Sequence, residues 1–170
     1  MTSCNSLINR FIIGIIFISI YACSSADDAQ KKFEQEAFRL PNAFTETNSS
    51  GEIINADPDD WRISPFYSSF VEIRPAFPNP TSGEVISLEL LITGLGSVNG
   101  LEVYFFDDRD RLRLIFFDER SPLPTGFTLI QINPMEFSSG STIAGAIGLH
   151  RVLIYDRRGN IISYGDIKVE

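Results

Sequence analysis

The feature that most constrains the fold of this chain is a series of short segments after residue 70 in which apolar and polar residues alternate. In the clearest segment, residues 86–92, the side chains of Ile86, Leu88, Leu90 and Ile92 are spaced two residues apart. Because successive side chains of a strand point to opposite faces, this spacing predicts a strand with one buried face. Comparable segments predict six further strands, near residues 70–74, 101–107, 112–118, 127–133, 149–156 and 161–169.

Turn-forming residues separate these segments. Asn79 and Pro80 fit the first two positions of a type I turn, and Gly83 can supply the positive φ that lets the chain reverse. An Asp-Arg-Asp-Arg run at residues 108–111 and the glycine Gly159 predict two hairpins. In the first hairpin we expect two sets of residues to face the core, namely Leu101, Val103 and Phe105, and Leu112, Leu114 and Phe116.

Seven short strands with no helical pattern between them predict an all-β fold. We expect an antiparallel immunoglobulin- or fibronectin-like β-sandwich of about seven strands, which occupies residues 61–170. A small β-barrel is the alternative architecture. Residues 23–60 are expected to form a tether of loops with one short helix.

The amino-terminal residues have the length of a signal peptide. A single cation, Arg10, precedes an uncharged apolar run over residues 11–22. A membrane-spanning helix needs roughly 20 apolar residues, whereas the apolar region of a signal peptide needs only about 7 to 15. We therefore interpret residues 1–22 as a signal peptide.

The residues at the end of this run resemble the lipobox of bacterial lipoproteins. Ile20 is the aliphatic residue three places before the cleavage point, Ala22 is the small residue before it, and Cys23 follows. Tyr21 departs from the small residue that is usual at the middle position. The resemblance implies a lipoprotein signal peptide and a Cys23 that carries diacylglycerol and an amide-linked acyl chain such as palmitate. An ordinary secreted protein with a free Cys23 thiol is the alternative.

Cysteine content and charge exclude several classes of protein. Cys4 lies in the predicted leader, so the mature chain would have no disulfide and no cysteine-ligated metal. The formal net charge is -8, and it becomes -9 when Arg10 is removed with the leader. An acidic surface argues against binding nucleic acid or anionic lipid headgroups. We expect the membrane to be contacted through the lipid anchor alone.

The segment after Cys23 is small and acidic, with Asp27 and Asp28 at its end. It resembles the acidic motif that follows the acylated cysteine in Bacteroidota lipoproteins exported to the cell surface; a solvated spacer is the plain alternative. This implies the outer membrane, with both the cell surface and the periplasmic face left open. Residues 29–40 follow and predict a helix of two or three turns, with Phe33 and Phe38 among its apolar residues.

Two segments of the predicted sandwich resemble the immunoglobulin-like carboxy-terminal modules of Bacteroidota, which include type IX secretion sorting domains and flagellar-hook-cap modules. The first is Phe-Pro-Asn-Pro-Thr-Ser-Gly at residues 77–83, followed by the alternating strand. The second is the Tyr-Asp-Arg-Arg-Gly-Asn hairpin at residues 155–160. The resemblance implies an immunoglobulin-like fold over about residues 70–170. Only a short segment precedes the module, so we do not expect a secretion cargo.

Two polar features invite a chemical interpretation. Asp57, Asp59 and Asp60 could offer oxygen ligands to calcium, but the segment lacks the Gly and Glu of an EF-hand loop, so we favour a turn capped by Asp side chains. The single histidine, His150, has neither a second histidine nor a nucleophile motif beside it, and we expect it to be structural. We predict no catalytic residue, no bound metal and no cofactor.

One surface is more apolar than a solvated face should be. In the central hairpin Tyr104, Phe106, Ile115 and Phe117 are expected to point outward and to form an aromatic patch. Monomers rarely expose large contiguous apolar patches, so either the predicted helix or another protein should cover it. We favour cover by the helix, through Phe33 and Phe38.

These observations predict a non-enzymatic, lipid-anchored cell-envelope protein that serves as an interaction or accessory module in an outer-membrane assembly. The alternative is a carbohydrate-binding or small-ligand-binding surface module, in which Trp61, Tyr67 and Tyr104 would form a stacking platform. The partner would be another envelope protein in the first case.

Overall fold

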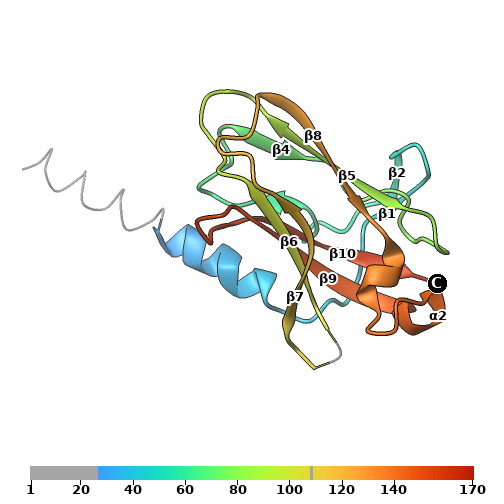
Figure 1. Ribbon diagram of the computed structural model, residues 1–170. Helices are drawn as coiled ribbons and strands as arrows, with labels where there is room; N and C mark the ends of the chain where they lie inside the picture. The colour runs from blue at the N-terminus through green and yellow to red at the C-terminus, as the bar shows by residue number, and fades with distance from the viewer. Residues whose placement is uncertain (1–26, 108) are drawn as a thin grey trace, which may run out of the picture.

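The computed structural model describes residues 27–107 and 109–170, and the predicted leader and Cys23 lie outside these ranges. Two antiparallel sheets pack face to face as a β-sandwich, with a helix at residues 27–37 laid against one side (Figure 1). The predicted all-β sandwich is therefore confirmed, and the barrel alternative is wrong. No helix in the described ranges has the length and apolar content that a membrane span requires.

The larger sheet has five strands in the order β3-β10-β9-β6-β7, and all its neighbouring pairs are antiparallel. Strands β6 and β7 form the predicted hairpin, as do β9 and β10, and the turn between β9 and β10 places Gly159 at φ 84°. The strands are β3 (Arg62–Ile63), β6 (Leu101–Phe106), β7 (Leu112–Asp118), β9 (Gly148–Tyr155) and β10 (Ile161–Val169).

The smaller sheet has three strands in the order β4-β5-β8. A short ribbon of β1 and β2 stands beside it, and two short helices precede β9. The elements are β1 (Glu46–Thr47), β2 (Ile53–Asn55), β4 (Val71–Ile73), β5 (Ile86–Ile92), β8 (Gly126–Ile132), the 3₁₀ helix η1 (Pro134–Phe137) and α2 (Ile143–Ala146).

The main core lies between the two sheets and uses the predicted alternation. Along β5 the burial alternates strictly, and all four of its core-facing residues have 2 % or less of their surface exposed. Leu101, Val103 and Phe105 of β6 are fully buried, as predicted. The period-2 pattern therefore identified the buried face correctly for the central strands of both sheets.

The prediction for β7 was wrong for two of its three residues. Leu112 and Leu114 are 42 % and 47 % exposed, and only Phe116 packs against the core. A β-bulge explains the difference: Phe116 pairs with the buried Val103, but the register then shifts, and Leu114 pairs with the outward Tyr104. Because the side-chain period is two, a shift of one residue moves the rest of the strand to the opposite face.

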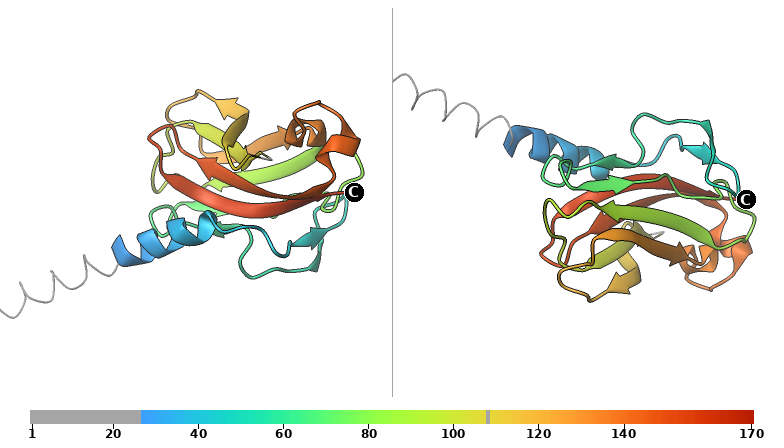
Figure 2. Two further views of the ribbon diagram at one scale, coloured as in Figure 1. Left: turned by 90° about the horizontal axis from the view of Figure 1, so that it is seen from below. Right: turned by 90° about the horizontal axis from the view of Figure 1, so that it is seen from above.

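The helix at residues 27–37 is docked on the outer face of the five-stranded sheet (Figure 2). Phe33 and Ala37 are buried and form a second hydrophobic cluster with Leu153, Ile161 and Tyr164. The Phe33 and Tyr164 rings lie 5.1 Å apart, which is within the range of favourable aromatic contact. The predicted helix thus has a docking site, and packing explains why so short a helix is formed.

The segment between the helix and β3 is integrated into the sandwich. Asn79, fully buried, donates its side-chain amide to the carbonyls of Thr45 and Asp166 and accepts from the backbone N–H of Lys168, each at 2.9 Å. The Thr47 N–H also donates to the Asn79 carbonyl at 2.7 Å. Asn79 is therefore buried, and its side chain links three segments of the chain through hydrogen bonds.

Candidate functional site

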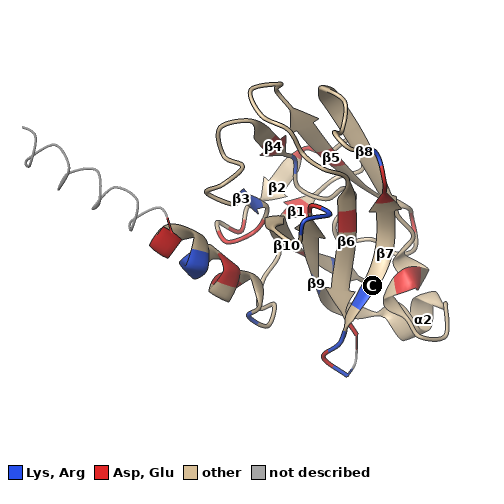
Figure 3. Cartoon of the chain, turned by 60° about the vertical axis from the view of Figure 1, so that its left-hand side comes forward, with Lys and Arg blue, Asp and Glu red and all other residues tan. Residues whose placement is uncertain are grey.

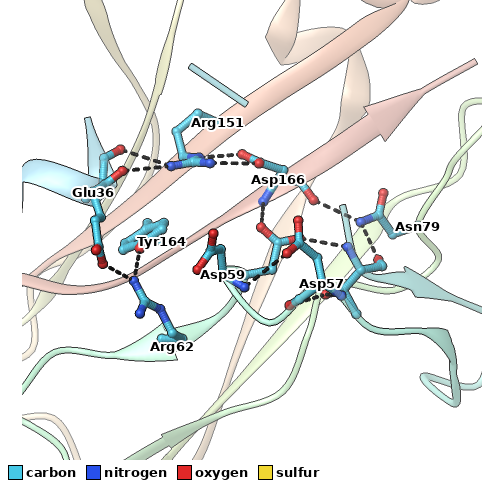
Figure 4. A network of polar contacts seen from close by, with 11 residues as sticks. Glu36, Asp57, Asp59, Arg62, Asn79, Arg151, Tyr164 and Asp166 are labelled. Carbon is cyan, nitrogen blue, oxygen red and sulfur yellow. Dashed lines mark hydrogen bonds and ion pairs between the residues drawn. The ribbon is translucent and has the colours of Figure 1, made fainter. Parts of the chain in front are cut away.

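The outer face of the five-stranded sheet carries the most distinctive chemistry of the molecule. Under the carboxy-terminal end of the docked helix lies a buried ion pair between Arg151 and Asp166, whose side chains are 6 % and 1 % exposed (Figure 4). Two guanidinium nitrogens of Arg151 donate to the two carboxylate oxygens of Asp166. The third donates to the carbonyls of Glu36 and Ala37 at 3.2 and 3.4 Å. Arg151 therefore caps the helix, whose last carbonyls lack partners within the helix.

A second carboxylate lies beside this ion pair. Asp60 is 8 % exposed, and its oxygens accept the backbone N–H of Asp166 at 3.0 Å and of Thr45 at 2.7 Å. Burial, and then the neighbouring Asp166 carboxylate, raise the pKa of Asp60 to about 7. Two carboxylates thus share one buried cation, at the place where residues 45 and 60 meet β10.

The guanidinium of Arg62 binds the solvent-exposed side of the helix. Arg62 of β3 forms an ion pair with Glu36 of the helix and donates to the Tyr164 hydroxyl. Its guanidinium also lies over the rings of Tyr164, at 5.6 Å, and Phe33, at 6.0 Å. The hydrogen bond from Arg62 holds the pKa of the Glu36 carboxyl below its ordinary value. These contacts and the ion pair below them make the helix a fixed part of the domain.

Beyond the end of the helix lies an open groove with a volume of about 780 Å³, and residues from both faces of the five-stranded sheet line it. Four segments line it: residues 38–41 after the helix, the β6–β7 hairpin, the region of η1 and α2, and the start of β9. Phe106 and Leu149 belong to its lining, as do the exposed apolar side chains of Phe38, Leu40 and Ile147.

Three arginines line the groove, although the chain is acidic overall. Arg39, Arg113 and Arg151 line it, against two acids, Asp107 and Asp110. The formal charge of the lining is therefore +1 (three minus two), in a chain of net charge -8. Charges of both signs gather at the hairpin that joins β6 and β7, beside the groove (Figure 3).

His150 lies at the edge of the groove but is held by packing. Its ring stacks on Phe137 with the centroids 4.6 Å apart, and its Nε2 is 2.7 Å from the Ala146 carbonyl oxygen. Burial lowers the pKa of His150, so the ring is neutral at pH 7 and its Nε2–H donates to that carbonyl. His150 therefore joins α2 to the sheet.

The four residues of the predicted aromatic patch lie on two different faces of the sheet. Tyr104, Phe106 and Phe117 lie on the outer sheet face, but Ile115, beside the bulge, packs against the main core. Phe38, the residue that follows the helix, contacts one edge of the patch, where its ring lies 6.0 Å from the Phe106 ring. The outward residues of the hairpin form what we call the outer strip: Tyr104, Phe106, Leu112, Leu114 and Phe117.

The aromatic platform that a carbohydrate module would need is not formed by the predicted residues. Trp61 and Tyr67 are 5 % and 6 % exposed. Trp61 lies flat against Gly165, where an added Cβ would approach the indole to 2.3 Å, and the Tyr67 hydroxyl donates to Asp156 at 2.6 Å. Tyr104 alone keeps an accessible ring, in contact with the Tyr155 ring.

The aspartates of residues 57–60 serve as caps. Asp57 accepts the backbone N–H of Asp59 at 3.0 Å, which confirms the predicted Asp-capped turn, and Asp60 is committed to its two backbone donors. Asp107 caps the hairpin turn in the same way, through the N–H groups of Arg109 and Arg111. Within residues 27–107 and 109–170, no three acidic, His or Cys side chains are grouped closely enough to hold a metal ion.

Sequence reasoning missed the buried cluster and the groove. Arg151 and Asp166 belong to separate strands, and their pairing depends on the β9–β10 register, which places them directly opposite each other. One signal was present: charged residues at these two positions interrupt the apolar pattern of strands that are otherwise buried. No known protein-family model matches this chain, and no curated protein is significantly similar to it.

Proposed function

We propose that this chain is a non-enzymatic, lipid-anchored cell-envelope protein of the outer membrane, and that its sandwich docks onto another envelope protein. The anchor would be Cys23, and the docking surface would be the outer strip. The exposure of the strip carries the proposal: Leu112, Leu114 and Phe117 are between 42 % and 47 % exposed on neighbouring positions of one sheet edge. A protein partner would remove this apolar surface from water.

The position of the helix supports a close association with the membrane. Only three residues separate Cys23 from Asp27, where the described helix begins. A fully extended residue spans at most about 3.6 Å, so these four peptide steps reach about 14 Å. Since the helix is fixed to the sandwich, an acylated Cys23 would hold the whole domain near the bilayer.

Replacing the predicted acylation site should release the protein from the membrane. In a bacterium that processes lipoproteins, we expect Cys23→Ala to move the mature chain from the membrane pellet to the soluble fraction, because no acyl chain remains. Cys4→Ala is the matched control and should stay in the pellet, since Cys4 lies in the predicted leader. Mass spectrometry of the amino-terminal peptide checks the chemistry directly. An unmodified wild-type Cys23 would contradict the proposed anchor.

Adding a charge to the outer strip should break the docking. We expect Leu114→Glu to reduce at least tenfold the recovery of the partner when the acylated protein is purified from envelope membranes under mild conditions. Leu129→Glu is the control: Leu129 is a similarly exposed leucine (52 % against 47 %) on β8, in the opposite sheet. Recovery of nothing but the chain itself, or equal recovery with both variants, would refute docking through this strip.

A further inference from the structure

The groove beside the helix has the size and lining of a small-molecule site. Its volume of about 780 Å³ falls within the roughly 300–1,000 Å³ that ligand pockets occupy. Phe106 and Leu149 lie on the outer face of the sheet, and Phe38, Leu40 and Ile147 add apolar surface from the two sides. Such sites are mainly apolar, with a few polar groups that orient the ligand.

Arg113 is the polar group best placed to fix a ligand. It comes from β7, its side chain is 34 % exposed, and its guanidinium lies over the Phe105 ring at 5.6 Å, which holds it in one orientation. Of its five N–H donors, one bonds to the Ser138 carbonyl at 3.2 Å. Its acidic neighbour Glu136 is 3.8 Å away and half exposed. The remaining donors of Arg113 are available to an anion.

Most of the other charges that line the groove are held in ion pairs. Arg39 is exposed at the end of the docked helix. Arg151 is saturated by Asp166 and the helix carbonyls, and Asp107 is neutralised by a bidentate pair with Arg111. Arg113 is paired with Glu136, which leaves Arg39 and Asp110 as the two lining charges outside these pairs.

We propose that this groove binds a small amphipathic carboxylate, whose apolar body lies along Phe106 and Leu149 and whose carboxylate pairs with the Arg113 guanidinium. Arg39 adds long-range attraction from the opposite wall. The planar guanidinium matches a carboxylate with two parallel hydrogen bonds, which an alcohol or an ammonium group cannot form. Phe106 belongs both to this groove and to the outer strip, but Arg113 lies outside the strip and Leu114 does not line the groove.

Decanoate is a suitable probe, titrated calorimetrically into the full mature chain that carries Cys23→Ala, so that no detergent is needed. We expect one decanoate to bind per chain and nonyltrimethylammonium, with the same nine-carbon alkyl chain, to bind at least tenfold more weakly. Arg113→Gln should weaken decanoate binding at least tenfold, because a hydrogen bond to a charged group contributes about 1.5–3 kcal/mol. Arg113→Lys, which keeps the charge but loses the bidentate geometry, should give an intermediate affinity.

Arg74→Gln is the matched control, since Arg74 is an exposed arginine paired with Glu89 on the other sheet, and it should leave decanoate binding unchanged. Methyl NMR locates the site: resonances of Ile147 and Leu149 should shift on titration while those of Leu129 stay in place. Any one of three results would overturn the proposal. These are equal decanoate affinity in Arg113→Gln and the unsubstituted chain, equal binding of the ammonium probe and of decanoate, and the absence of decanoate binding. Loss of partner docking in Leu114→Glu bears only on the docking function.

Discussion

Replacing Arg151 by Met is expected to destabilise the domain by about 3–5 kcal/mol, the usual cost of leaving one partner of a buried ion pair without its counterion. Met keeps much of the aliphatic volume but leaves the Asp166 carboxylate buried beside Asp60. The carbonyls of Glu36 and Ala37 also lose their donor, so the carboxy-terminal end of the helix should loosen. Urea unfolding at pH 8 measures the effect.

A matched exposed pair provides the control for this substitution. Arg120 is 54 % exposed and pairs with Asp118, so Arg120→Met should cost less than about 1 kcal/mol. The double variant Arg151→Met/Asp166→Asn removes both charges of the buried pair and should be more stable than Arg151→Met alone. If Arg151→Met unfolded at the same urea concentration as Arg120→Met, the buried pair would have no special role in stability.

The stability of the folded chain should fall as the pH rises from about 4 to about 7, and Asp60 should be the main cause. Because its pKa is raised from 3.8 to about 7, the folded state keeps a proton on Asp60 that the unfolded chain has already lost. The contribution is complete below pH 3.8 and disappears as the pH passes through 7. Three pH units at about 1.4 kcal/mol each give a total of about 4 kcal/mol.

Asp60→Asn should remove most of this slope, since the amide does not titrate, while Asp166, whose pKa burial also raises, is still present. It also replaces one of two acceptors for backbone N–H groups, so a pH-independent loss of about 1–3 kcal/mol is expected alongside. Asp59→Asn, at an exposed side chain one residue earlier, is the control and should retain the slope of the unsubstituted chain. Urea midpoints at half-unit intervals from pH 4 to 8 decide the question, and identical slopes for Asp60→Asn and Asp59→Asn would disprove the assignment.

The fold was predictable because the alternation of apolar and polar residues in a strand can be recognised from residues that are close together in the sequence. The β5 segment specifies its own buried face, since its four core positions hold large apolar residues whatever lies opposite. The same reasoning failed at Leu112 and Leu114 because a bulge is a property of a strand pair, and both faces of the β6–β7 hairpin carry large apolar residues. Alternation cannot choose a face when neither face is polar.

The candidate sites were less predictable because tertiary pairing creates them. The spacing of Phe33 and Ala37 indicated an apolar helix face, but only the structure places it over Leu153 and Tyr164. Asn and Asp are residue types typical of exposed turns. Asn79 and Asp60 are nevertheless buried, because their polar atoms form hydrogen bonds with the backbone of distant segments. Residue type alone cannot separate a solvated Asp or Asn from a buried one whose hydrogen bonds are satisfied.

The docked helix has a mechanical consequence if Cys23 carries the lipid. A force applied to the anchor would be transmitted to the domain through the helix rather than through a flexible linker. The contacts of Glu36 with Arg62 and Arg151 would resist this force together. Those contacts join the helix to β3 and β9, the two strands that flank β10 in the larger sheet. Tension from the membrane would therefore spread across three hydrogen-bonded strands, and the domain would move with its anchor as one rigid body.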